Sequence, residues 1–358
     1  MKGWVAESKA PNGLHKNAHY NASIGKTWEN RDIPMITVGG GPGSKVIYIQ
    51  ATMHAREWIA ATTAMWVAKE LLTNKDPRVV ALVKQYKWVI IPVANPDGYE
   101  FSRTMGNRLW RKNRNPNIGA DGTGKSGDCI GVDMNRNWGQ SWHLGDPDKQ
   151  EITGSDGRQG SDDQCTYVYR GTGPFSEKET AAISHLFQRF KDEGNMPVAG
   201  IDLHSYSQTI MYPYGFTKEP TQNHANLKTC ADRMKAVIDL ENQAATGTAE
   251  VVTASLIESG TLPASSKVDA APAYHPSLGP TSYRAFRSVD LYPAFGEFSD
   301  WAYSDGTNNK FSYCIELPDG PMGQQRYGFE LPPNEIRSVG KDIFGSLLEM
   351  AACIAEVN

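Results

Sequence analysis

Short apolar runs typical of buried strands alternate along this chain with longer amphipathic stretches typical of helices. The strand-like runs span 45–52, 87–92, 198–203, 209–214 and 310–317. The helix-like stretches span 57–73, 176–191, 222–240 and 334–356. The second helix-like stretch opens with Ser176 and Glu179 in the spacing of a capping box. Strands interleaved with helices predict an α/β fold with a mixed, mostly parallel central sheet that is flanked by helices on both faces.

The composition excludes several classes of protein. The chain has 358 residues, of which 39% are hydrophobic and 21% are charged, and its formal net charge is -4. These values are typical of a globular protein that is long enough for one large domain or two small ones. Mild acidity gives no reason to expect nucleic acid as a partner. No apolar run approaches the roughly 18 residues that cross a membrane, so we expect no membrane partner either.

Ionisable side chains gather where two of the strand-like runs end. His54 and Glu57 follow the first run and are three residues apart, so they lie on one face of a helical turn. His204 directly follows the apolar run AGIDL. Because ligands of open α/β sheets bind outside the carboxyl ends of strands, we expect the three side chains to meet there. Two imidazoles and a carboxylate suit zinc and leave a coordination position open for water.

Chance alone produces some of these pairs. With 40 acidic residues in the chain, eight histidines give roughly one acid three positions after a histidine. The sequence has two such pairs, His54 with Glu57 and His143 with Asp146. His143 lies in the polar stretch WHLGDPDKQ with no strand-like run before it. We therefore interpret the pair at His143 as the chance occurrence.

Five motifs appear in a fixed order along the chain. They are MHAREW at 53–58, RLWRKNR at 108–114, GVDMNRNW at 131–138, HSYSQ at 204–208 and YCIEL at 313–317. In this order they resemble the zinc metallocarboxypeptidases of the carboxypeptidase A and B type, from about Ser23 to the C-terminal helix-like stretch. The resemblance implies a zinc carboxypeptidase-like catalytic domain at 23–358, preceded by an atypical N-terminal segment at 1–22. It also implies one zinc ion per chain.

The resemblance assigns a catalytic centre residue by residue. His54, Glu57 and His204 match the zinc ligands, Glu316 matches the general base, and Arg111 matches the cation that polarises the scissile carbonyl. Zinc acidifies its bound water, a carboxylate can accept the released proton, and positive charge stabilises the developing oxyanion. Taken alone, Arg111 would more simply be a surface arginine. Glu316 is harder to explain in that way, because a carboxylate inside an apolar run should face a site or a buried pair.

The resemblance also implies where a peptide would bind. The matching positions are Asn135, Arg136 and Tyr292 for the terminal carboxylate, and Arg56, Arg108, Tyr206 and Phe329 for secondary subsites. An arginine can hold a carboxylate through two parallel hydrogen bonds, which lysine cannot reproduce. Without the motifs, Arg136 would be interpreted as a surface residue and Tyr292 as a half-buried aromatic.

The side-chain pocket decides which terminal residue is preferred. The resemblance implies a lining of Asp202, Met211, Gly215, Arg287, Ala294, Glu297, Phe298, Ser299 and Cys314. Relatives of the B type carry Asp where Ser299 stands, and A-type relatives carry an apolar residue there. Glu297 stands where these enzymes usually have Gly, so a carboxylate can still reach the pocket, although Arg287 could neutralise it. We expect a preference for aromatic and large aliphatic C-terminal residues, with Lys or Arg as the alternative.

Cysteine usage and the N-terminus bear on location. Five cysteines leave at least one free or bonded to another chain. Cys129 and Cys165 match a disulfide of the family, and the pairing of Cys230, Cys314 and Cys353 stays open. The first residues lack the apolar stretch of a signal peptide, and 1–22 show neither a helix nor the inhibitory prodomain of family precursors. The resemblance nevertheless implies a secreted monomer that acts on the C-termini of peptides and proteins.

Two other functions compete with a carboxypeptidase. A non-catalytic carboxypeptidase-like binding module should lack the base or a zinc ligand, and this chain has matches for all of them. A zinc deacylase or amidase acting on small acyl amino acids shares the zinc ligands but should lack the full MNRNW motif and the tyrosine. The sequence therefore predicts a zinc-dependent metallocarboxypeptidase.

Overall fold

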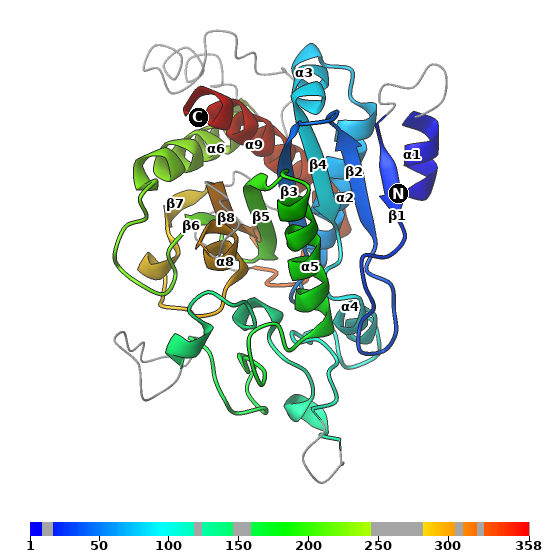
Figure 1. Cartoon of the computed structure of the whole chain (residues 1–358), viewed down its shortest axis with the longest axis vertical. Coiled ribbons are helices and arrows are strands. Elements are labelled where there is room, and N and C mark those ends of the chain that lie inside the picture. Colours follow the sequence, from blue (N-terminus) through cyan, green and yellow to red (C-terminus); the bar gives the residue numbers. More distant parts are fainter. Residues whose placement is uncertain are drawn as a thin grey trace.

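A single eight-stranded sheet organises the described part of the chain (Figure 1). The computed structural model describes residues 1–8, 17–117, 124–145, 159–244, 282–304, 311–320 and 326–357. The strands are β1 (His19–Asn21), β2 (Met35–Gly39), β3 (Lys45–Ala51), β4 (Tyr86–Ile91), β5 (Pro197–Ser205), β6 (Thr209–Tyr212), β7 (Arg284–Arg287) and β8 (Phe311–Leu317). Their order across the sheet is β1-β2-β4-β3-β5-β8-β6-β7.

The central strands of the sheet are parallel to one another. Antiparallel pairs lie toward its edges. The neighbours β4, β3, β5 and β8 are all parallel, as are β6 and β7. The pairs β1–β2, β2–β4 and β8–β6 are antiparallel. This arrangement confirms the predicted mixed, mostly parallel sheet.

Helices cover both faces of the sheet, as expected (Figure 1). On one face α2 (Trp58–Thr73), α3 (Pro77–Gln85), α6 (His224–Ala244) and α9 (Ile336–Val357) share a large apolar core with the sheet. On the other face α5 (Lys178–Asp192) and α8 (Phe298–Ser304) enclose a smaller core with β3 and β4. A further short helix, α4 (Pro96–Ser102), follows β4 along the chain.

The alternation of side chains along the central strands separates apolar from polar groups. Ile201 and Leu203 of β5 lie in the larger core, on the α2 and α9 face. Because successive side chains of a strand point to opposite faces, Asp202 and His204 face the α5 and α8 side. That side of the sheet carries the polar residues of the site.

The observed elements agree with the predicted ranges except at some ends. The predicted strand at 209–214 ends at Tyr212, one residue before a proline. The capping box at Ser176 is wrong, because α5 begins at Lys178 and its N-cap has no side-chain hydrogen bond. The Ser176 hydroxyl instead donates to Glu177, and the Glu179 carboxylate accepts a bond from the buried Asn113 at 3.0 Å. Ser176 and Glu179 therefore have other partners and do not form a capping box.

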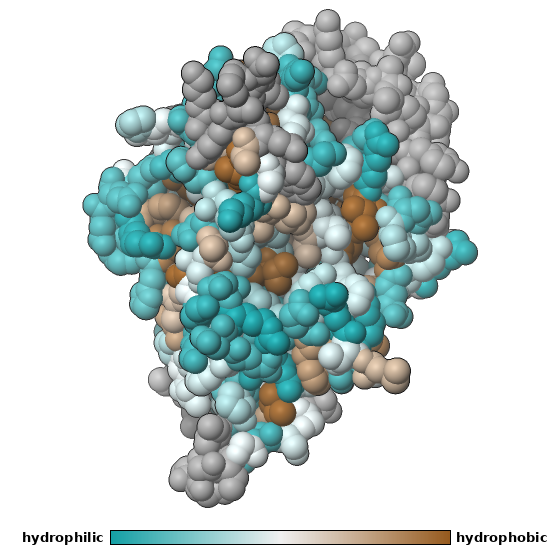
Figure 2. Space-filling model, turned by 90° about the vertical axis from the view of Figure 1, so that its right-hand side faces the viewer, coloured by the Kyte–Doolittle hydropathy of each residue, from teal (hydrophilic) through white to brown (hydrophobic). Residues whose placement is uncertain are grey.

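The N-terminal segment does contain a helix, contrary to expectation. Helix α1 (Lys2–Ser8) packs against α2, and its Val5 is 6% exposed in the larger core. Strand β1 then pairs with β2 at the edge of the sheet. Figure 2 views the molecule from this side, and its described surface is mainly hydrophilic with scattered apolar patches. The partition of the chain at residue 22 stays a prediction.

Two disulfides fasten the described residues. The expected bond between Cys129 and Cys165 is confirmed, and a second bond joins Cys230 of α6 to Cys353 of α9. Cys314 is the free and buried cysteine, which agrees with the odd number in the sequence. Among the described helices we find none with the length and apolarity needed to cross a membrane.

Candidate metal centre and substrate site

The strand ends bring the predicted metal donors together. The chain leaves β3 at Ala51, and His54 and Glu57 lie in the turn before α2. Strand β5 lies beside β3 and carries His204 near its carboxyl end. On the other side of β5, the strand register places Glu316 of β8 directly opposite His204. Parallel pairing therefore gathers four residues that are far apart in the sequence.

His54, Glu57 and His204 form the group of potential metal donors in the described residues. The Nδ1 atom of His54 lies 2.7 Å from Glu57 Oε1, and that of His204 lies 2.9 Å from Glu57 Oε2. The two Nδ1 atoms are 3.1 Å apart, and none of the three residues is more than 4% exposed. Two nitrogens and a carboxylate facing one point fit a zinc ion with an open coordination position. The other pair, at His143, is exposed at its histidine, and Asp146 lies outside the described residues.

Two further carboxylates orient the imidazoles. Asp133 Oδ1 lies 3.1 Å from Nε2 of His54, and Asp202 Oδ2 lies 2.8 Å from Nε2 of His204. A carboxylate on the outer nitrogen keeps a proton there and leaves the inner nitrogen as the metal ligand. Sequence reasoning missed this role for both residues. For Asp202 the signal was present, because it lies two positions before His204 and so on the same face of β5.

Glu316 is a partly buried acid with one oxygen that lacks a partner among the described residues. Burial raises the pKa of Glu316 to about 7, and the nearby Glu57 carboxylate adds to the shift. For Glu57 itself, burial would raise the pKa, but His54 and His204 outweigh it and hold the pKa well below its usual range. The Glu316 Oε2 atom is buried and has no hydrogen-bond partner among the described residues. A buried acceptor of this kind calls for a partner that the chain does not supply, such as a water molecule on a metal ion.

Arg111 and Asn135 flank the donors. Both Nε and one terminal nitrogen of Arg111 donate to Asp133 Oδ2, at 3.1 and 2.7 Å. Asp133 thus links this guanidinium to His54. The Asn135 Nδ2 atom lies 3.3 Å from His204, while its Oδ1 accepts a bond from the Phe298 backbone at 2.9 Å. The structure therefore places both residues next to the three potential metal donors.

Arg136 is almost wholly buried, at 2% exposure. It donates to the Asn135 carbonyl at 2.8 Å and lies 3.4 Å from Glu297 Oε1. Burial lowers the pKa of Arg136, but Tyr292, followed by Asp133 and Glu297, more than reverses this and keeps it charged. A permanent buried cation beside a tyrosine hydroxyl is suited to binding a carboxylate.

The four residues predicted for secondary subsites form one wall. The guanidinium of Arg56 lies 4.1 Å from the Phe329 ring centroid, and the Tyr206 ring lies 4.9 Å from the same centroid. Arg108 donates to the Arg56 carbonyl at 2.7 Å and also to the Phe329 carbonyl. The cation–π contact between Arg56 and Phe329 and the contact between the two rings hold these side chains in place.

The structure brings some residues of the predicted side-chain pocket together and separates others. Strand pairing places Asp202, Cys314 and Met211 in one row across the sheet, next to the row of His204 and Glu316. Phe298 instead packs in the smaller core at 0% exposure, and Ser299 is 2% exposed on α8.

Arg287, which could have neutralised Glu297, pairs with another acid in the structure. The guanidinium of Arg287 pairs with Asp290 at 2.9 Å and donates to the Lys218 carbonyl at 2.7 Å. Arg136 is the cation that faces Glu297. Burial raises the pKa of Glu297, while Arg136 acts in the opposite direction.

A buried three-donor centre at the carboxyl end of a parallel sheet, next to an acid with a free oxygen, is the arrangement of a metal-dependent hydrolase. Comparison with protein families gives the more specific assignment. The family model described as zinc carboxypeptidase matches residues 10–346, and the chain belongs to this family.

Individual relatives agree with this assignment. Mouse carboxypeptidase A4 is 34% identical over 318 residues, which are 87% of this chain and 60% of the mouse protein. The inactive metallocarboxypeptidase ECM14 of Paracoccidioides brasiliensis is 33% identical over 339 residues, or 91% of this chain and 49% of the fungal protein. The bovine thrombin-activatable fibrinolysis inhibitor, solved in complex with tick carboxypeptidase inhibitor, superposes with a TM-score of 0.69 at 25% identity, covering 100% of this chain and 96% of that one. The chain thus spans about half to 60% of the length of these two curated relatives.

We expect the purified protein to contain one zinc ion per chain, which elemental analysis can measure. The variant His204→Ala removes one of three donors and should lower zinc affinity by at least about tenfold, since loss of even an outer-shell partner costs about 10- to 100-fold. Competition with a coloured chelator gives the affinity directly. His143→Ala is the matched control and should retain the metal. Zinc binding of unchanged affinity in His204→Ala would contradict the assigned ligand set.

Proposed function

We propose that this chain is a zinc-dependent metallocarboxypeptidase that hydrolyses the C-terminal peptide bond of peptides and proteins. The observation that supports it best is the free Oε2 atom of Glu316, buried beside the donors His54, Glu57 and His204. An acid without a partner at a three-donor site is suited to activating water. A structural carboxylate in the same place would be expected to have a partner in the protein.

The chemistry divides between the metal and the chain. When bound by His54, Glu57 and His204, zinc acidifies a water molecule and polarises a carbonyl oxygen. Glu316 accepts the proton of the attacking water, and its raised pKa of about 7 suits a base that must release that proton again near neutral pH. It then delivers the proton to the nitrogen of the leaving amine. Arg111 donates hydrogen bonds to the oxygen of the scissile carbonyl as negative charge develops on it.

The requirement for a chain end comes from Arg136. Its buried guanidinium, with Asn135 and the Tyr292 hydroxyl beside it, would bind the terminal carboxylate of the substrate. The wall of Arg56, Arg108, Tyr206 and Phe329 would contact the preceding residues. A peptide bound in this way presents its last peptide bond to the metal centre.

An inactive binding module is the main rival, because a fungal relative is named inactive. In the present chain the three donors are in mutual contact, and Glu316 lies opposite His204 on the neighbouring strand. Arg111 is also in contact with the centre through Asp133. These contacts favour an active enzyme. A deacylase of small acyl amino acids should lack part of the group Asn135, Arg136 and Tyr292. The presence of all three residues in this chain disfavours a deacylase.

We also propose that the protein works outside the cell, as a monomer. Its two disulfides support this location, since such bonds persist in oxidising compartments and are rare in the cytosol.

For the terminal side chain we propose aromatic and large aliphatic residues first. Ser299 is uncharged where relatives of the B type have Asp, which supports this order. One observation favours Lys or Arg as a second class. Glu297 lies beside Gly215 and faces Arg136 at 3.4 Å, and Arg287 is occupied by Asp290. A substrate carboxylate on Arg136 would leave Glu297 available for a cationic side chain.

Within the proposed function, the first prediction concerns the base. Glu316→Gln should reduce kcat by at least about a hundredfold, since general base catalysis contributes roughly 10²–10⁴-fold, and should leave zinc content unchanged. Single-turnover kinetics on a short peptide, with metal analysis of the same sample, measure both. Activity within about tenfold of the parent would exclude Glu316 as the base.

The second prediction concerns the chain end. Amidation of the C-terminus removes a charge and two charge-assisted hydrogen bonds of roughly 1.5–3 kcal/mol each, so kcat/KM should fall about a hundredfold or more. Arg136→Ala should lose most activity on the free acid and discriminate far less against the amide. Paired assays of acid and amide peptides test this. Similar rates of the parent enzyme on both would favour a deacylase or an endopeptidase.

The third prediction concerns Glu297. The parent should cleave C-terminal Phe and Leu faster than Lys and Arg, and Glu297→Gln should lower the ratio of Lys to Phe cleavage by about tenfold, equal to about 1.4 kcal/mol. Peptides that differ in their last residue alone give the ratio. Ser299→Asp is the opposing control and should raise it. An unchanged ratio in Glu297→Gln would mean that this carboxylate does not reach the terminal side chain.

A further inference from the structure

A cavity of about 310 Å³ is lined in part by the loop that also carries Arg108 and Arg111. Its larger lining side chains are Phe101, Leu109, Trp110, Arg114, Ile130 and Tyr167. The volume is at the lower end of the roughly 300–1,000 Å³ of small-ligand pockets. None of these side chains has a role in the chemistry proposed above.

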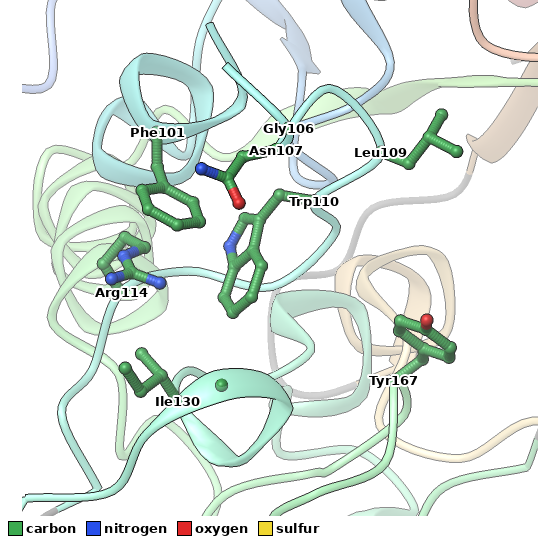
Figure 3. Close-up of a pocket in the computed structure, with 9 residues that line it drawn as sticks. Phe101, Gly106, Asn107, Leu109, Trp110, Arg114, Ile130 and Tyr167 are labelled. Carbon is green, nitrogen blue, oxygen red and sulfur yellow. The ribbon is translucent and has the colours of Figure 1, made fainter. Parts of the chain in front are cut away.

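One wall of this pocket is held rigidly. The Phe101 and Trp110 rings meet edge to face, with their centroids 5.0 Å apart. The Trp110 indole donates to the Lys112 carbonyl at 2.6 Å, which fixes its orientation. The Arg114 guanidinium lies 3.7 Å from the Phe101 centroid, and Figure 3 shows the three side chains together on one side of the cavity. The wall is therefore formed before any ligand arrives.

A disulfide holds the opposite wall. Ile130 follows Cys129 in the chain, and Tyr167 lies two residues after Cys165, so the bond between these cysteines joins both segments. In Figure 3, Ile130 lies below Trp110, and Tyr167 lies across the cavity from Phe101. The disulfide thus ties the two segments of this wall to each other, and the first wall comes from a separate part of the chain.

Exposed apolar side chains gather at this pocket. Among the described residues, Met105 is 99% exposed, Leu109 is 56% exposed and Tyr167 is 62% exposed, and one other large hydrophobic residue, Leu291, is 38% exposed. Leu109 and Tyr167 line the pocket, and Met105 precedes the lining residue Gly106. A concentration of exposed apolar groups around a hollow is a mark of a binding site.

The chemistry of the lining favours an apolar ligand. The one charged side chain named in the lining is Arg114, which is stacked on Phe101 and lies 3.5 Å from the Glu29 carboxylate. Its charge therefore already has a counterion, which disfavours an anionic ligand. An aliphatic or aromatic side chain would instead bury the exposed faces of Leu109 and Tyr167.

The pocket adjoins the substrate site through the loop itself. Arg108 contacts the Arg56 carbonyl, and Arg111 contacts Asp133, whereas Leu109 and Trp110 between them line the pocket. Tyr167 also reaches toward the site. The pKa of Arg56 is lowered by burial and by Arg111, and Tyr167 is among the groups that oppose this shift. A peptide that leaves the metal centre along Arg56 thus has the pocket next to its path.

We propose that this pocket binds an apolar side chain of the substrate, located upstream of the residues that contact Arg56 and Phe329. The proposal rests on the carboxypeptidase function proposed above. The enzyme would then favour longer substrates with Leu, Phe or a similar residue at one upstream position, in addition to its preference at the chain end. The binding energy is realised in the ground state and the transition state alike, so the preference appears in KM.

The experiment compares substrates that share their last two residues. An N-acylated dipeptide is the short substrate, and longer peptides carry Leu or Ser at each upstream position in turn. For the parent enzyme, one position should give a kcat/KM about tenfold or more higher with Leu than with Ser, as burial of a leucine side chain allows. The double variant Leu109→Ser with Tyr167→Ser should abolish that preference through KM and leave the dipeptide rate unchanged. Both positions are exposed, so the fold should tolerate the changes.

Met105→Ser is the matched control, because Met105 is the most exposed of these residues and is not part of the lining. It should keep the upstream preference of the parent. Equal rates for Leu and Ser at every upstream position would overturn the pocket proposal while short substrates are still cleaved. An equal loss on the dipeptide in the double variant would also overturn it, because the loop would then act through Arg111. Failure of the parent to cleave any of the peptides would overturn the proposed function, and the pocket proposal with it.

Discussion

The site depends on the balance of buried charge around two imidazoles. Glu57, Asp133 and Asp202 contact His54 and His204 directly, and Arg111 is the guanidinium that contacts this set. Three carboxylates and one guanidinium leave a formal excess of two negative charges in a largely buried cluster. Buried charges are costly unless they are paired or bind a metal. A divalent cation held by His54, Glu57 and His204 would supply the missing charge, which would explain why the centre can be both acidic and buried.

The sheet determines where that balance is made. Each donor lies at or just beyond the carboxyl end of a central strand, and parallel pairing brings those ends to one edge. Strand alternation then separates the two faces, so that Ile201 and Leu203 complete the larger core while Asp202 and His204 face the site. A shift of β5 by one residue would turn both polar side chains into the apolar core. The burial of the isoleucine and leucine therefore also maintains the register that the metal centre needs.

Local sequence patterns predicted those parts of the structure that depend on neighbours in the chain. The central strands, the longer helices and the pair His54 and Glu57 follow from periodicity and from spacing at a strand end. Contacts across loops were beyond such reasoning. The pairing of Arg287 with Asp290, for example, could not be distinguished from a contact with Glu297, because both acids lie close to it in the sequence. Helix α1 was missed because seven residues hold too few periodic positions, and its stability comes from packing against α2.

In the proposed function, Arg136 would connect the charge balance to substrate selection. In the free protein its guanidinium faces Glu297, so this buried carboxylate is partly neutralised. A substrate carboxylate that binds Arg136 takes over the same donors, since one guanidinium has a fixed number of N–H groups. Glu297 then either takes up a proton, for which its raised pKa prepares it, or meets a cationic side chain of the substrate. In the proposed function, the first outcome would apply to an aromatic terminal residue and the second to Lys or Arg. The same carboxylate would then tolerate both classes of substrate, because desolvation makes its neutral form accessible.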